Sequence, residues 1–115
     1  MVKVVVVIRR VDGMSRETFL RYWQQDLVPY VAALPGVRRY RQSPATHRAK
    51  GWPWDGAAEL WFDDFAAVKA AFASPAGIAL NTYEEQFISE KSWFIAEDRP
   101  VVGFADVESP TSVPW

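Results

Sequence analysis

Hydrophobic residues recur at two different spacings along the chain, and the alternation of these spacings predicts its architecture. Residues 2–10 form a run of β-branched side chains with charged ends, which is typical of a central strand buried on both faces. Residues 16–34 carry apolar side chains at helical spacing, so they form one broad stripe that faces a flat layer. Ser15 can cap this helix, and Pro35-Gly36 ends it.

One proline, Pro29, lies inside this predicted helix. A proline has no backbone N–H and clashes with the preceding turn of a helix. We therefore expect the helix to kink near Pro29, or to leave the carbonyl of Gln25 free toward a cavity.

The remaining chain repeats the order strand, helix, strand. The expected segments are an edge strand at 37–43, a long loop at 44–56, a strand at 57–62, two helical segments from about 65 to 89 divided at Ser74-Pro75, and a last strand at 91–96. This order predicts an α+β fold of the ferredoxin-like type, with an antiparallel sheet and helices on one face. We expect one domain at residues 1–99 and a C-terminal tail at 100–115.

The second face of such a sheet would expose valine and tryptophan side chains. Soluble monomers rarely expose an apolar patch of that size, and face-to-face pairing of two copies would cover it. The sequence therefore predicts a homodimer, in the form of a dimeric α+β barrel.

The composition of the chain argues against several classes of binding partner and functional site. The chain of 115 residues has a net charge of −1, from 13 basic and 14 acidic side chains, which argues against nucleic acid or membrane partners. It has no cysteine, one histidine, no glycine-rich phosphate loop and no nucleophile elbow, so we expect neither a metal site nor a cofactor. The first apolar run is too short for a signal peptide, so we expect a cytoplasmic protein.

Three segments resemble the EthD family of small dimeric α+β barrel proteins. They are Tyr22 to Pro29, which matches a YW..xH.P helix segment, Pro35-Gly36 to Tyr40, which matches a PG..Y segment, and the strand Glu59-Leu60-Trp61-Phe62. The resemblance covers about residues 3–97. Leu27 stands where the family usually has histidine. The resemblance implies an aromatic or apolar small-molecule substrate, because the wider superfamily includes cofactor-free monooxygenases, polyketide cyclases and lactone isomerases.

Three residues are candidates for proton transfer. His47, the only histidine, lies in the predicted loop and would act as an acid or base if the loop folds over the barrel mouth, or else is a solvated loop residue. Asp26 lies at the edge of the apolar stripe, where partial burial would raise its pKa, unless it is simply solvated. Tyr40 matches the family tyrosine and either contacts ligand or is a core residue bonded to backbone.

The expected substrate-binding residues are aromatic or acidic: Trp23, Tyr22, Glu59, Trp61 and Trp54. Glu59 and Trp61 share one strand face, and a glutamate would not point unpaired into the helix layer, so we expect this pair to face the cavity. Trp54 forms either a lid or a cover for the barrel end.

These residues support three functional hypotheses. The first is a cofactor-independent isomerase, cyclase or lyase that holds an apolar or aromatic oxygenated substrate and uses general acid/base catalysis. The second is a small-molecule binding or sequestering barrel protein without catalysis, which Leu27 favours. The third, weaker hypothesis is a structural partner subunit of an oxygenase pathway.

Overall fold

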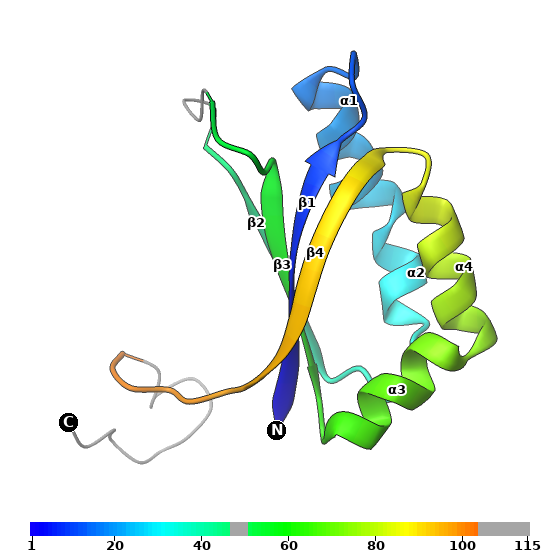
Figure 1. The fold of residues 1–115 in the computed structure, drawn as a ribbon. Helices are drawn as coiled ribbons and strands as arrows, with labels where there is room; N and C mark the ends of the chain where they lie inside the picture. The colour runs from blue at the N-terminus through cyan, green and yellow to red at the C-terminus, as the bar shows by residue number, and fades with distance from the viewer. Residues whose placement is uncertain (47–50, 104–115) are drawn as a thin grey trace.

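The computed structural model describes residues 1–46 and 51–103, which form one antiparallel sheet with helices on one face (Figure 1). Its elements in chain order are β1 (Val2–Arg10), α1 (Arg16–Arg21), η1 (Tyr22–Asp26), α2 (Val28–Ala32), β2 (Arg39–Pro44), β3 (Gly56–Phe62), α3 (Phe65–Ala73), α4 (Pro75–Glu84) and β4 (Ile88–Glu97). The strand order is β2-β3-β1-β4. This arrangement confirms the predicted ferredoxin-like α+β fold.

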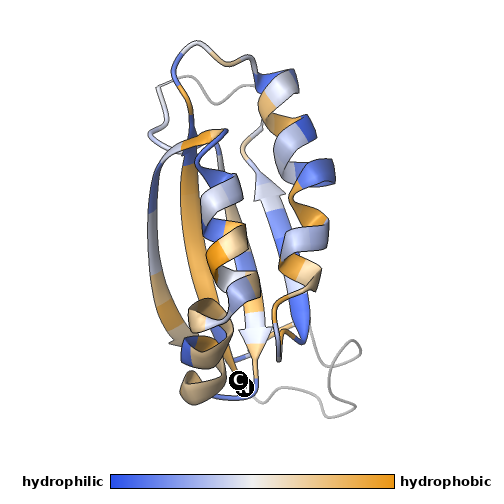
Figure 2. Cartoon of the chain, turned by 90° about the vertical axis from the view of Figure 1, so that its right-hand side faces the viewer, coloured by the Kyte–Doolittle hydropathy of each residue, from blue (hydrophilic) through white to orange (hydrophobic). Residues whose placement is uncertain are grey.

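The central strand is β1, which pairs with β3 on one side and β4 on the other. Its bounds and its central place agree with the prediction. The expected burial on both faces is absent from the described chain, because only Val4 and Ile8 on the helix side are buried and Val5 and Val7 on the other face are partly exposed. Val4 and Ile8 point toward the helices and are buried in the core with Leu60 and Phe62 of β3. Figure 2, viewed from the helix side, shows the helical segments in front of the sheet and running roughly along its strands.

The first helical segment departs from the single continuous helix that we predicted. Its middle turn, η1, is a π-helix, in which the N–H of Leu27 donates to the carbonyl of Tyr22, five residues earlier, at 2.8 Å. After this wider turn, Pro29 falls in the first turn of α2, where its missing N–H is not needed. The helix is therefore irregular before Pro29, but the irregularity begins at Tyr22, about two helical turns earlier than the proline.

Two side-chain caps mark the starts of α3 and α4 in the second helical segment. The side chain of Asp64 accepts a hydrogen bond from the N–H of Ala67 at the start of α3, and that of Ser74 accepts from the N–H of Gly77 at the start of α4. The division at Ser74-Pro75 is as predicted. Helix α4 ends at Glu84, about five residues earlier than expected. The chain has to leave the helix there because Ile88, the first residue of β4, already pairs with Arg10 of β1.

Strand β2 is an edge strand, as its polar composition predicted, and β4 forms the other edge. After β4 the described chain continues to residue 103 (Figure 1). The greater part of the predicted tail, residues 104–115, lies outside the described residues, so the domain boundary near residue 99 stays a prediction.

Candidate functional site

A cavity of about 450 Å³ lies between the sheet and the helices. We call it the helix-side cavity. Most of its lining is aliphatic or aromatic: Val4, Val6, Ile8, Trp23, Leu27, Val31, Ala58, Leu60, Val68, Phe72, Leu80 and Ile95. Phe65 and Trp93 also line it although they are 55% and 61% exposed, so the cavity opens to solvent beside them. A cavity of this size and lining suits a small apolar or aromatic ligand.

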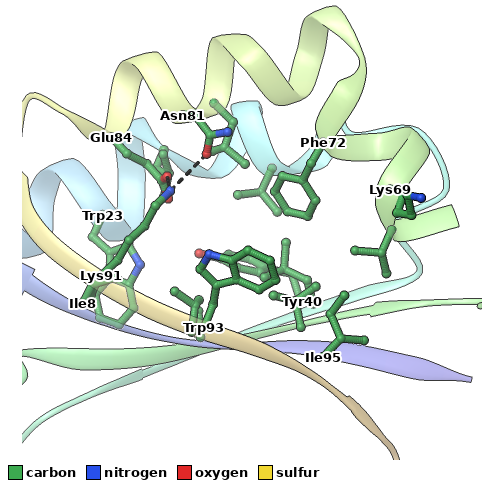
Figure 3. A pocket seen from close by; sticks show the side chains of 18 of the residues that line it. Ile8, Trp23, Tyr40, Lys69, Phe72, Asn81, Glu84, Lys91, Trp93 and Ile95 are labelled. Carbon is green, nitrogen blue, oxygen red and sulfur yellow. Dashed lines mark hydrogen bonds and ion pairs between the residues drawn. The ribbon is translucent and has the colours of Figure 1, made fainter. Parts of the chain in front are cut away.

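Tyr40 places a hydroxyl group among these apolar side chains (Figure 3). The amide Nε2 of Gln42 donates a hydrogen bond to the Tyr40 hydroxyl oxygen at 2.8 Å. Because that oxygen already accepts a hydrogen bond, the Tyr40 O–H can donate its proton to another group. Tyr40 is therefore equipped to donate a hydrogen bond to an oxygen atom of a ligand.

The π-helical turn helps to position Gln42. In a regular α-helix the N–H of Leu27 would bond to the carbonyl of Trp23, but here it bonds to the carbonyl of Tyr22. The Trp23 carbonyl instead accepts a hydrogen bond from Nε2 of Gln42 at 2.8 Å. The same amide group thus joins the helix to the Tyr40 hydroxyl, which links an irregular backbone turn to the geometry of the site.

Burial raises the pKa of the Tyr40 hydroxyl above its ordinary value of 10.0, because removal from water disfavours the charged tyrosinate. The hydrogen bond from Gln42 acts in the opposite direction and lowers that pKa, while the negative charge of Glu84 raises it further. The net effect is a raised pKa, so Tyr40 is neutral at physiological pH and keeps its proton for donation.

The polar side of the cavity is formed by α4 and the edge strand β4. Nζ of Lys91 contacts Oε1 of Glu84 at 2.7 Å and Oδ1 of Asn81 at 3.1 Å. The two partners from α4 and the lysine from β4 form a bridge at one end of the cavity (Figure 3). Glu84 thereby gains a fixed orientation, and its carboxylate can accept a proton from a bound molecule.

Among the predicted site residues, Trp23 and Tyr40 line the helix-side cavity. Their contact with a ligand stays a prediction. Leu27, at the position where the EthD pattern usually has histidine, is also buried and lines the cavity. The helix therefore contributes apolar surface at this point and no group that can carry a proton.

Glu59 and Trp61 lie outside the lining of the helix-side cavity. They lie on the sheet face away from the helices, as predicted, and their contact with a ligand stays a prediction. Side chains alternate along β3, so Leu60 lines the cavity while Glu59 and Trp61 point to the opposite face. There Glu59 pairs with Lys3 at 2.7 Å, and the guanidinium of Arg39 lies 4.7 Å from the Trp61 ring centroid.

Asp26 and Tyr22 lie outside the lining of the helix-side cavity. Asp26 is exposed at the end of η1, so the expected partial burial of its carboxylate is absent. Burial, together with the nearby Asp26 carboxylate, raises the pKa of Tyr83. Tyr22 stacks on Phe87 with ring centroids 5.5 Å apart and packs the outer part of the core.

The two predicted site residues of the long loop are Trp54 and His47. Trp54 lines a separate, polar depression at the end of the sheet, with Arg9 stacked over its ring at 5.2 Å, and is absent from the lining of the helix-side cavity. It therefore forms no lid over that cavity. His47 lies outside the described residues, and its predicted catalytic role stays a prediction.

Glu84, Asn81, Lys91 and Lys69 line the cavity but were missed in the sequence. A signal for Glu84 was present, because it follows the inward-facing Leu80 by four positions and so shares its helix face. The two lysines gave no such signal, because a lysine at the edge of a cavity cannot be told from any other surface lysine in the sequence. Within residues 1–46 and 51–103, no cluster of His, Asp and Glu can hold a metal ion, and no helix is long and apolar enough to cross a membrane.

Comparison with known proteins supports the fold. The structure resembles an ethyl tert-butyl ether D (EthD) family protein from Bacillus halodurans C-125, with a TM-score of 0.74 and 18% identity, covering 86% of this chain and 99% of that one. HapK from Hahella chejuensis gives a TM-score of 0.69 at 19% identity, with coverage of 90% and 97%. A dimeric ferredoxin-like protein of unknown function from Thermobifida fusca YX gives 0.69 at 15%, with coverage of 84% and 90%.

No curated protein sequence matches the chain. The structural likenesses have low sequence identity and show the fold alone. The model of the EthD domain matches residues 11–91, which is more than half of the chain. The protein therefore belongs to the EthD domain family.

Proposed function

We propose that the protein is an enzyme that needs no cofactor and acts on an apolar or aromatic oxygenated small molecule in the helix-side cavity, as an isomerase, cyclase or lyase. The observation that carries this proposal is that the Tyr40 hydroxyl and the Glu84 carboxylate line one apolar cavity. Glu84 is close enough to influence the pKa of Tyr40. A hydrogen-bond donor and a base therefore face the same small volume.

The reaction class that fits this pair is removal of a proton from the carbon next to a carbonyl group. Glu84 accepts the proton as the C–H bond breaks, and the electron pair moves onto the carbonyl oxygen to give an enolate. Tyr40 donates a hydrogen bond to that oxygen, where negative charge develops. Lys91 holds the carboxylate in place. Return of the proton to the same or another carbon completes an isomerisation, and isomerases, cyclases and lyases can share this enolate.

This step can be tested without knowing the natural substrate. In deuterium oxide, the protein should accelerate exchange of the acidic protons of 2-tetralone, an aromatic ketone, as followed by proton NMR. Ala58 lies on the cavity wall and is buried, so Ala58→Phe should fill the cavity and return the exchange rate to background. Circular dichroism checks that this variant is folded. Acceleration that survives in folded Ala58→Phe would place the activity elsewhere.

A second candidate function is binding or sequestration without turnover. It is favoured by Leu27, which fills with an apolar side chain the cavity position where the family usually has histidine. Saturable binding of 2-tetralone without accelerated exchange would support this function and contradict the enzyme.

We also propose that two copies pair through the sheet face away from the helices. That face carries Val5, Val7 and Ala57, with Phe94 beside Val5 and 60% exposed. Apolar side chains grouped on an open sheet face favour association of two copies. Solved structures with this fold include proteins described as dimeric, from Bacteroides fragilis and Thermobifida fusca.

Phe94→Asp should convert the dimer to a monomer, because a carboxylate on each copy would be buried without a partner at the interface. Light scattering at micromolar concentration measures the mass. Ile78→Asp is a matched control, since Ile78 is also 60% exposed but lies on α4, away from the open face of the sheet. A wild-type monomer, or equal dissociation of both variants, would contradict this interface.

A further inference from the structure

The charged groups lining the helix-side cavity do not balance. They are Lys69, Glu84 and Lys91. Glu84 and Lys91 neutralise each other through their 2.7 Å contact. The same ammonium group of Lys91 also donates a hydrogen bond to Oδ1 of Asn81. One positive charge, that of Lys69, remains without an anionic partner in the cavity.

Lys69 lies at the other end of the cavity from the Lys91 bridge (Figure 3). It forms no ion pair with any residue in 1–46 or 51–103, and its Nζ lies 5.8 Å from the ring centroid of Phe65, one helical turn earlier in α3. Phe65 is itself a half-exposed residue of the lining. The cation thus stands beside exposed aromatic surface at the mouth of the cavity.

This position is suited to the charged end of an amphipathic ligand. At the mouth a charge keeps part of its hydration, so an ion pair there avoids the cost of burying a charge inside the apolar cavity. The apolar body of the ligand can fill the interior, with an oxygen atom reaching Tyr40. The long side chain of Lys69 can lie along apolar surface while its ammonium group meets an anion.

We infer that the ligand is an aromatic or apolar carboxylate whose acid group pairs with Lys69 while its apolar, oxygenated part occupies the cavity toward Tyr40. This inference rests on the proposed function, because it concerns the same cavity. Lys69 would then determine specificity for acids over neutral molecules, and Glu84 and Tyr40 would act on the other end.

Two probes of similar shape and different charge test this inference. They are 6-hydroxy-2-naphthoic acid, which is an anion at neutral pH, and its neutral carboxamide, each titrated calorimetrically at low ionic strength. The wild type should bind the acid about three- to five-fold more tightly than the amide, the range expected of a solvent-accessible ion pair. Lys69→Gln should remove this preference, Lys69→Glu should reverse it, and 0.5 M salt should weaken it in the wild type.

Arg21→Gln is the control for overall charge, because Arg21 is an exposed cation on α1 outside the cavity lining. It should leave the preference unchanged. Equal loss of both probes in Lys69→Gln, or an unchanged preference, would overturn the role of Lys69. A third outcome is that the amide binds, that Ala58→Phe blocks this binding, and that the acid binds no more tightly than the amide. In that case the cavity assignment stands and only the carboxylate inference fails. If neither probe binds and 2-tetralone is not exchanged, the proposed function fails as well.

Discussion

Glu84→Gln is expected to lower the rate of proton exchange in 2-tetralone by about 10²–10⁴-fold, the usual contribution of a general base. Glutamine has nearly the same shape as glutamate but cannot accept the proton. Affinity for 2-tetralone should change little, because the apolar lining supplies most of the contact surface. Exchange rates by NMR and affinity by calorimetry separate the two effects.

The control is Glu85→Gln, which removes the next carboxylate from an exposed position and should leave the rate unchanged. Tyr40→Phe removes the donor to the developing oxyanion and should reduce the rate by about 10²–10³-fold. If Glu84→Gln retains the wild-type rate in a folded protein, Glu84 is not the base.

The raised pKa of Tyr40 predicts how stability and the exchange rate depend on pH. The folded state favours the neutral hydroxyl, so its contribution to stability is present below the ordinary pKa of about 10 and is lost as pH rises above it. Ionisation of Tyr40 should therefore not reduce the exchange rate between pH 7 and 9.

The sequence was sufficient for the order of elements because hydrophobic periodicity reports which side chains must be buried. The run at residues 2–10 needed neighbours on both sides, and β1 lies between β3 and β4. The α-helical stripe could not reveal the π-helical turn, since the shift of one hydrogen bond from Trp23 to Tyr22 leaves the apolar pattern nearly intact. Pro29 was the only local sign of irregularity.

The candidate site was harder to predict than the fold. Periodicity assigned Glu59 and Trp61 to the correct face of β3, but it does not tell on which face of a sheet packing leaves a cavity. That depends on how the side chains of α3, α4 and the strands fill the space between them, which is a property of three-dimensional packing. Tyr40 was found through its family motif, whereas Glu84 and Lys91 meet only when α4 and β4 come together.

Trp23→Ala is expected to destabilise the protein by about 3–5 kcal/mol, the usual cost of removing a large buried aromatic side chain. Trp23 is 1% exposed, packs against Phe19 with ring centroids 5.5 Å apart, and lies against Gly56 of β3. Such a loss is a large share of the about 5–15 kcal/mol that stabilises a typical domain. Urea unfolding measures the change in the free energy of unfolding.

Trp93→Ala provides a matched comparison, because Trp93 also lines the helix-side cavity but is 61% exposed. Its removal should change stability by less than about 1 kcal/mol, since little buried area is lost. It should nevertheless weaken binding of 2-tetralone, because the indole forms one side of the cavity mouth. Together, the two variants separate the two uses of tryptophan in this cavity: Trp23 holds the helix on the sheet, and Trp93 contacts what enters. Equal destabilisation by both substitutions, with no effect of Trp93→Ala on binding, would contradict that division.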